Sequence, residues 1–343
     1  MRVLVTGGTG LIGSWVVREL RSRRHAVRVL VRPQSDLSNL AGCDVELARG
    51  DVLDSPSVEA ALEGCDAVVH CAGHVQFGDR ARLGAVNAGG VEVVLGAALR
   101  AGIRRALLTS STAVMGGSRR PTVADEASPM NADELGIDYF ESKSRGEAAA
   151  LTLFERGLPV VVVRPSVVLG PGDVYRSSGG TVLALARRAL PFYVDGGTSY
   201  CDVRDVARGH AEALERGTPG DVYILGGANL ATTDMIRRVC QICGVPPPRR
   251  LAYPLARAAV AVAAWAARRS GRMPKVSTGL VQASHLYTFV SSEKARRQLG
   301  YESRPFEDSV RDTLRWFMER GRLKPTTPEL RALMRADPEP AML

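Results

Sequence analysis

The chain has 343 residues, of which 45% are apolar, so it can bury a sizeable core and should be globular. Its net charge of +9 comes almost entirely from Arg distributed along the chain, and no basic stripe is interleaved with aromatic residues. We therefore expect no nucleic-acid partner, and no apolar run reaches the roughly 18 residues that a membrane span requires.

The six Cys are scattered, and no secretory leader precedes the first expected strand, which favours a reduced cytoplasm. The one close pair, Cys240 and Cys243, has no second pair or His cluster beside it in the sequence. We expect buried helix thiols there and no metal site.

Short apolar strands alternate with helical spacing over the first two thirds of the chain. A strand at 1–6, a helix at 11–23 and a strand at 26–31 form a βαβ unit. Further strands are expected at 45–47, 67–71, 106–109, 160–164 and 222–225. The alternation predicts an α/β fold with a doubly wound parallel sheet, whose ligands bind at the carboxyl ends of the strands.

A glycine-rich turn joins the first strand to the first helix, in the segment Thr6-Gly7-Gly8-Thr9-Gly10-Leu11-Ile12-Gly13. The first glycine of a trio spaced by three allows the tight turn, the second lets a pyrophosphate approach the helix N-terminus, and the third permits close helix packing. The turn predicts a dinucleotide site with contacts from Gly7, Thr9, Gly10, Leu11, Ile12 and Gly13.

The end of the second strand indicates which dinucleotide is bound. Val31 stands where an acidic residue would hold the ribose hydroxyl of NAD, and Arg32 follows it. A guanidinium can pair with the 2′-phosphate of NADP, so we expect NADP, with NAD as the alternative and a solvated strand end as the plain interpretation of Arg32.

Two further strand ends supply expected cofactor contacts. Asp51 and Val52 follow the third strand and could meet the adenine edge, although Asp51 could equally cap a helix. Ala72 and Gly73 follow the fourth strand with small side chains where a ligand must pass. The neighbouring His70 is interpreted as a strand-end histidine with satisfied hydrogen bonds.

Tyr139 and Lys143 stand four residues apart, on one face of an expected helix. An ammonium beneath a phenol favours its ionised form, which an unperturbed Tyr with a pKa of about 10 does not reach near neutrality. Alone, the pair would indicate a solvated helix face, but together with the glycine turn it predicts a hydride-transfer site that uses both residues for catalysis and cofactor binding.

The β-α alternation loosens from about Pro171 onward. We expect residues 1–170, completed by about 201–226, to form the dinucleotide-binding domain, and residues 171–200 and 229–323 to form a smaller substrate lobe. Residues 324–343 carry no packing signal and are expected to be a tail. The sequence leaves the oligomeric state open, a homodimer included.

Several spaced motifs resemble those of the extended short-chain dehydrogenases/reductases, in the branch of dihydroflavonol reductases and 3β-hydroxysteroid dehydrogenases. The chain looks closest to bacterial dihydroflavonol-reductase-like proteins, which include hopanoid-associated sugar-epimerase-like proteins. The likeness covers residues 1 to about 322, and its markers lie at 6–13, 70–73, 109–116, 139–143, 164–166, 170–173 and 202–207.

The resemblance implies roles for individual residues. Ser111 would hydrogen-bond the substrate oxygen, with Ser110 as the neighbour that could be confused with it, while Tyr139 transfers the proton. Lys143 would hold the ribose hydroxyls and lower the pKa of Tyr139. The resemblance adds Pro165 and Val168 as contacts near the nicotinamide.

The leading hypothesis is an NADP-dependent oxidoreductase acting on a ketone or secondary alcohol of a small apolar or ring-containing molecule, such as a dihydroflavonol, steroid or terpenoid. The alternatives are a sugar-nucleotide epimerase or dehydratase with tightly bound NAD, and a cofactor-sensing regulator. The neighbourhood 164–168 lacks the Asn that many such epimerases carry, and intact Ser111, Tyr139 and Lys143 argue against a sensor.

Substrate contacts are expected from residues 172–200 and 255–288. In the second segment, alternating Ala and Val with Trp265 could line an apolar pocket, pack as plain core or rest on a membrane surface. Ala-rich helices mostly serve close packing, so we expect plain core.

Overall fold

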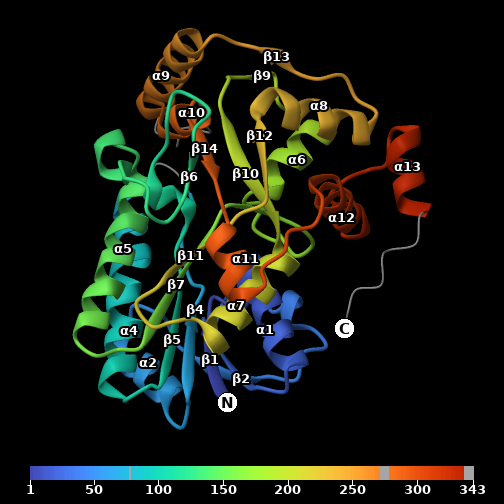
Figure 1. Ribbon diagram of the computed structural model, residues 1–343. Helices are drawn as coiled ribbons and strands as arrows, with labels where there is room; N and C mark the ends of the chain where they lie inside the picture. Colours follow the sequence, from blue (N-terminus) through green and yellow to red (C-terminus); the bar gives the residue numbers. More distant parts are fainter. Residues whose placement is uncertain (77–78, 271–277, 336–343) are drawn as a thin grey trace.

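A parallel seven-stranded sheet lies at the centre of the computed structural model, which describes residues 1–76, 79–270 and 278–335 (Figure 1). The strands are arranged in the order β11-β7-β5-β4-β1-β2-β3. They are β1 (Arg2–Thr6), β2 (Ala26–Val31), β3 (Glu46–Arg49), β4 (Ala67–His70), β5 (Arg105–Thr109), β7 (Val160–Pro165) and β11 (Val222–Leu225). This topology confirms the predicted doubly wound α/β fold.

Helices cover both faces of this sheet (Figure 1). One face carries α1 (Leu11–Ser22), α7 (Val203–Arg216) and α11 (Glu293–Leu299), and the other carries α2 (Ser55–Leu62), α4 (Gly90–Arg100) and α5 (Asp138–Glu155). Successive side chains of a strand point to opposite faces, so Val3 and Val5 join the first core and Leu4 joins the second. Both faces being buried explains why the strands are almost continuously apolar.

The helix before the fifth strand is unusually long. It combines α3 (Arg80–Gly84), the π-helical turn η2 (Ala85–Gly89) and α4. By length and composition alone, the stretch Arg80–Arg100 is the one helix of the described residues that could cross a membrane, but half of its apolar window is buried. It packs between α2 and α5, as a core helix does.

A second group of elements lies over the carboxyl ends of the sheet (Figure 1). Strand β10 (Gly197–Asp202) pairs with β8 (Val167–Leu169), β12 (Ala228–Ala231) and β14 (Tyr287–Val290), and β14 also pairs with β6 (Val123–Ala124). A separate core forms among α6 (Gly179–Ala186), α8 (Thr232–Cys243), α12 (Phe306–Glu319) and α13 (Pro328–Arg335). The outer end holds β9 (Phe192–Tyr193), β13 (Arg249–Arg250), α9 (Tyr253–Arg269) and α10 (Thr278–Ser284). Short 3-10 turns complete the elements: η1 (Ser38–Leu40), η3 (Thr112–Met115) and η4 (Ala132–Leu135).

The expectation of a tail from residue 324 is wrong as far as Arg335. Residues Pro328–Arg335 form α13, whose Leu330 is fully buried beside α8 and α12. The sequence hides this helix because prolines flank it, and its apolar side chains recur only over two turns. Residues 336–343 of the expected tail lie outside the described residues.

Candidate functional site

The glycine turn after β1 depends on close backbone contacts. Gly7 has a φ of +69°, and a Cβ atom there would lie 2.6 Å from the Ala72 nitrogen. A Cβ at Gly13 would lie 2.3 Å from the Gly7 carbonyl oxygen, so α1 packs directly on the turn. Gly10 precedes α1 as its N-cap and brings no capping side chain. No side chain therefore caps the first turn of α1, and its free backbone N–H groups fit an approaching pyrophosphate.

This turn lies at the point where the strand order reverses. Strand β1 stands between β2 and β4, and Thr6 at its end is paired with His70 at the end of β4. The loop after β4 carries Ala72 and Gly73, and Asn87 fixes that loop by accepting from the His74 N–H at 2.7 Å and donating to the His74 carbonyl at 2.9 Å. Ligands of doubly wound sheets bind at such a reversal.

Arg32 directly follows β2 and is half-buried. Burial lowers the pKa of His74, and the charges that lower it further include Arg32, which therefore lies toward the loop after β4. Among the described residues no carboxylate pairs with the Arg32 guanidinium, while its backbone N–H donates to Ser35 Oγ at 3.2 Å. The cation thus follows β2, the strand beside β1, and has no counter-ion among the described residues.

Asp51 makes a tight turn after β3. Its Oδ1 accepts from the Leu53 N–H at 3.0 Å, and its carbonyl accepts from Ser57 Oγ at 3.3 Å. The N-cap of α2 is Asp54, so the helix-cap interpretation of Asp51 is wrong. Val52 lies against Gly90 of α4, next to the site of a hypothetical Gly90 Cβ.

Ser111, Tyr139 and Lys143 meet at the end of β5. Ser111 caps η3 by accepting from the Ala113 N–H at 3.1 Å, and it forms a hydrogen bond with Tyr139. Lys143 lies one turn further along α5 and donates from Nζ to the Thr109 carbonyl at 2.9 Å. Ser110, the neighbour, has a buried Oγ with no hydrogen-bond partner among the described residues. The contact with Tyr139 therefore distinguishes Ser111 from Ser110.

The pKa of Tyr139 shifts in the direction opposite to the expectation. Burial raises the pKa of Tyr139, and the hydrogen bond from Ser111 opposes the rise only in part. The expected lowering by Lys143 is therefore not seen. Burial also lowers the pKa of Lys143 to about 8, against the favourable charge of Glu147. At neutral pH the phenol is protonated and the amine is charged, so the trio offers a proton donor beside a cation.

The comparisons with known proteins were made against this geometry. The model of the NAD dependent epimerase/dehydratase family matches residues 3–226. The chain belongs to this family. Members bind NAD(P) as the cofactor, and the result confirms the resemblance inferred from the motifs.

Individual relatives cover nearly the whole chain. A protein from Synechocystis sp., provisionally named dihydroflavonol 4-reductase, is 34% identical over 93% of this chain and 95% of its own length. A 3 beta-hydroxysteroid dehydrogenase/Delta 5-->4-isomerase from Mycobacterium tuberculosis is 31% identical over 88% of this chain and 86% of its own. The solved structure of a nucleoside-diphosphate-sugar epimerase from Pseudomonas aeruginosa matches with a TM-score of 0.79 at 27% identity, covering 94% of this chain and 99% of its own.

In this family member a buried ion pair lies one turn beyond Lys143. The Arg164 Nε donates to both carboxylate oxygens of Glu147 at 3.1 Å, and the side chains are 5% and 3% exposed. The sequence analysis missed both residues as part of the site. A signal was present, because Glu147 follows Lys143 by four residues and so shares its helix face.

A chain of neutral polar groups lies under the trio. Thr109 Oγ1 donates to Cys71 Sγ at 3.2 Å and contacts His210 Nε2 at 3.0 Å. Burial raises the pKa of Cys71 to about 11 and lowers that of His210 to about 4. These groups carry no charge near neutrality. No sequence spacing links them, because the pairing of β4 with β5 and the packing of α7 against β5 bring them together.

His70 is only partly satisfied, which corrects the interpretation from sequence. Its Nδ1 contacts Thr6 Oγ1 at 2.7 Å, while its buried Nε2 has no partner among the described residues. Burial lowers the pKa of His70 to about 3, followed by the charge of Lys143. The ring is therefore neutral at the base of the site.

Pro165 and Val168 continue from the end of β7 into β8, next to the trio's strand β5. Val168 is buried, and its carbonyl accepts from Ser178 Oγ. Asn39, which the sequence analysis did not consider, donates from Nδ2 to the Thr9 carbonyl at 3.1 Å and to the Gly172 carbonyl at 2.8 Å. It thereby fastens the glycine turn to the segment that follows β8.

Cys240 and Cys243 are buried in α8, as expected for helix thiols. Over the described ranges no three His, Cys, Asp or Glu side chains gather in a way that could hold a metal ion.

Proposed function

We propose that the protein is an NADP-dependent oxidoreductase that transfers hydride to or from a ketone or secondary alcohol of a small apolar or ring-containing molecule. The observation that carries the proposal is the hydrogen bond between Tyr139 and Ser111, one helical turn from the Lys143 ammonium. When bound, the nicotinamide supplies the hydride, and the protein supplies the proton and the orientation.

Each member of the trio has a task that its surroundings support. Tyr139 is held protonated by burial, so in the reducing direction its hydroxyl can give a proton to the oxygen of the substrate. Ser111 can donate to the same oxygen and polarise the carbonyl. Lys143 is positioned by the Thr109 carbonyl, and its charge is supported by Glu147.

We propose that residues 1–170 with 201–226 bind the dinucleotide and that residues 171–200 and 229–323 cover the substrate. Within the second group, α11 packs on the dinucleotide-binding sheet and so supports the sheet. The relatives named for dihydroflavonols and hydroxysteroids act on ring-containing molecules by their names, which supports that substrate class for this chain.

Arg32 supports NADP over NAD, because it is a half-buried cation that lacks a carboxylate partner among the described residues. Arg32→Ala should weaken NADPH binding by about tenfold or more, which corresponds to a lost charge-assisted hydrogen bond, and leave NADH binding nearly unchanged. Arg104→Ala is a suitable control, since Arg104 precedes β5 and so lies at the amino ends of the strands, away from the carboxyl ends where Arg32 lies. Equal losses for both dinucleotides would contradict the assignment.

The second candidate is an epimerase or dehydratase acting on a sugar nucleotide, which the family and the Pseudomonas structure support. Such enzymes often carry an Asn in the neighbourhood 164–168. This chain has no Asn there, and the Arg164 side chain forms an ion pair with Glu147. Purified protein should consume NADPH with at least one ketosteroid, dihydroflavonol or related ketone. Tightly held NAD without NADPH consumption, together with interconversion of a sugar nucleotide, would favour the second candidate.

A further inference from the structure

Helix α9 exposes large apolar side chains to solvent. Its buried stripe consists of Ala256, Val260 and Ala264, while on the outer side Leu255, Val262 and Trp265 are 62%, 66% and 61% exposed. The expectation that Trp265 belongs to a plain core is therefore wrong. The periodicity concealed this because α9 is apolar on both faces, and only one face is covered.

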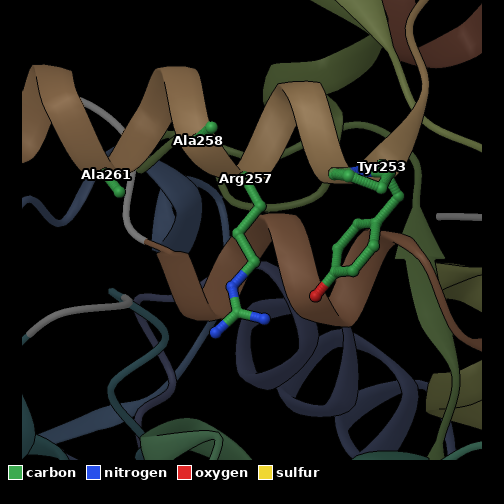
Figure 2. A pocket seen from close by; sticks show the side chains of 5 residues that line it. Tyr253, Arg257, Ala258 and Ala261 are labelled. Atoms are coloured by element: carbon green, nitrogen blue, oxygen red, sulfur yellow. The ribbon is translucent and has the colours of Figure 1, made fainter.

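The hollow along α9 is shaped by Tyr253, Pro254, Arg257, Ala258 and Ala261. Figure 2 shows the side chains of Tyr253 and Arg257 extending to the same side of α9, where α10 packs against it. The Tyr253 ring is stacked on His285, with centroids 4.1 Å apart. Arg257 is exposed on this side of α9, so its guanidinium lies outside the core.

The net charge of the chain arises, in the sequence, from the segment that contains this helix. The whole chain holds 45 Lys and Arg against 36 Asp and Glu, and residues 235–292 contain nine of these cations and no Asp or Glu. The rest of the chain therefore carries 36 of each sign. Arg is dispersed, as expected, and the net charge arises because this segment lacks acidic residues. The nine cations are Arg237, Arg238, Arg249, Arg250, Arg257, Arg268, Arg269, Arg272 and Lys275.

Some of these cations are neutralised and others are not. Arg237, Arg238 and Arg250 pair with Asp234, Glu307 and Asp195. Arg257 and Arg269 form no ion pair with any described residue. The Arg269 guanidinium lies 5.5 Å from the centre of the Trp265 ring, so a cation accompanies the largest exposed apolar side chain.

We propose that α9 docks on the surface of a lipid bilayer that contains anionic lipids. Leu255, Val262 and Trp265 would enter the interfacial layer, and Arg257 and Arg269 would meet the lipid phosphates. The 17 residues of the helix extend about 25 Å, fewer residues than the roughly 20 that a span requires, so α9 would lie in the plane of the surface.

Charge favours lipid over a second copy of the chain. A twofold contact through α9 would bring the same cations of both copies together, with no acid in the flanking segment to balance them. Nucleic acid would match the charge but would leave Leu255 and Val262 without a role. An anionic bilayer satisfies both the apolar face and the cations.

Sedimentation of the full-length protein with vesicles tests the proposal. Vesicles of phosphatidylcholine with phosphatidylglycerol should bind the protein, binding should fall as salt is raised, and vesicles of phosphatidylcholine alone should bind much less. Trp265→Ser should weaken partitioning roughly tenfold, through the lost apolar burial. Arg257→Ala and Arg269→Ala should each weaken it roughly fivefold.

Matched controls distinguish binding through α9 from non-specific adsorption to vesicles. Leu255→Ser should reduce partitioning, whereas Leu47→Ser, at a leucine 41% exposed on β3, should not. Unfolding midpoints and circular dichroism identify variants that fail to fold. With brominated lipids, the wild-type tryptophan emission should be quenched, and the variant Trp265→Phe should keep binding but lose most of the quenching.

The proposal is overturned if Trp265→Ser sediments like the wild type, or if neutral and anionic vesicles bind equally. It is also overturned if the protein ignores vesicles and α9 variants instead dissociate an oligomer, or if only nucleic acid binds with the same dependence on Arg257 and Arg269. None of these measurements needs the cofactor or the substrate, so they stand apart from the enzymatic proposal.

Discussion

The dinucleotide half and helix α9 present polar and apolar groups in opposite ways. In the first, charged groups such as Glu147 and Arg164 are buried and paired, and the glycine turn is packed against neighbouring backbone. On α9, Trp265 and Val262 face outward, beside cations that form no ion pair with the described residues. The comparison teaches that the first region pairs its buried charges within the chain, whereas α9 exposes apolar side chains that no described residue covers.

The largest expected effect tests the chemistry of the dinucleotide half. Tyr139→Phe removes the hydroxyl that transfers the proton and should lower kcat by roughly 10²- to 10⁴-fold. Binding of NADPH, measured by fluorescence, should remain. Turnover close to that of the wild type would show that Tyr139 does not transfer the proton and has only a packing role.

The buried ion pair offers the sharpest contrast in stability. Glu147→Gln leaves the Arg164 guanidinium buried without its carboxylate and should lower the free energy of unfolding by about 3–5 kcal/mol. Glu307→Gln makes the same change in the half-buried pair with Arg238, whose side chains are 33% and 39% exposed, and a loss of less than about 1 kcal/mol is expected there. Chemical denaturation of both variants gives the answer, and similar losses would break the contrast.

Gly13 and Gly180 allow a tightly packed backbone position to be compared with an open one. At Gly13 a methyl group would lie 2.3 Å from the Gly7 carbonyl oxygen, so Gly13→Ala should cost about 1–3 kcal/mol and weaken dinucleotide binding. At Gly180 in α6 the nearest atom is 3.6 Å away, and Gly180→Ala should be neutral or slightly stabilising. Thermal unfolding with and without NADPH measures both, and a tolerated Gly13→Ala would show that the turn can yield.

The smallest effect concerns pH. Because the pKa of Lys143 is lowered to about 8, its cation is present below pH 8 and is lost as the pH rises through that value. NADPH affinity should therefore fall, by about tenfold between pH 7 and 9, as the charge-assisted contact to the ribose disappears. Lys143→Arg keeps its charge over this range and should give a flat titration. A sloping profile in that variant would assign the pH dependence to another group.

The sequence predicted what short-range patterns encode. The strand bounds followed from apolar runs, and the glycine turn, Tyr139 and Lys143 each belong to a local motif. Glu147 had a local signal in its spacing from Lys143, but its pairing with Arg164 had none. The Thr109–His210 contact and the role of Asn39 were hidden in the same way, because strand pairing and helix packing bring these residues together across long separations. The outward face of α9 was missed for another reason, since an all-round apolar helix does not show which side is covered.

The Asn39 carboxamide has a consequence for how the two ligands would affect each other's binding. By holding the carbonyls of Thr9 and Gly172 together, it joins the turn that receives the pyrophosphate to the start of the segment proposed to cover the substrate. A ligand that restricts the motion of one of these segments should also restrict the other, and such coupling is reciprocal. Bound dinucleotide should therefore raise the affinity for the substrate, and bound substrate should raise the affinity for the dinucleotide. Removing the two Asn39 hydrogen bonds should abolish this coupling.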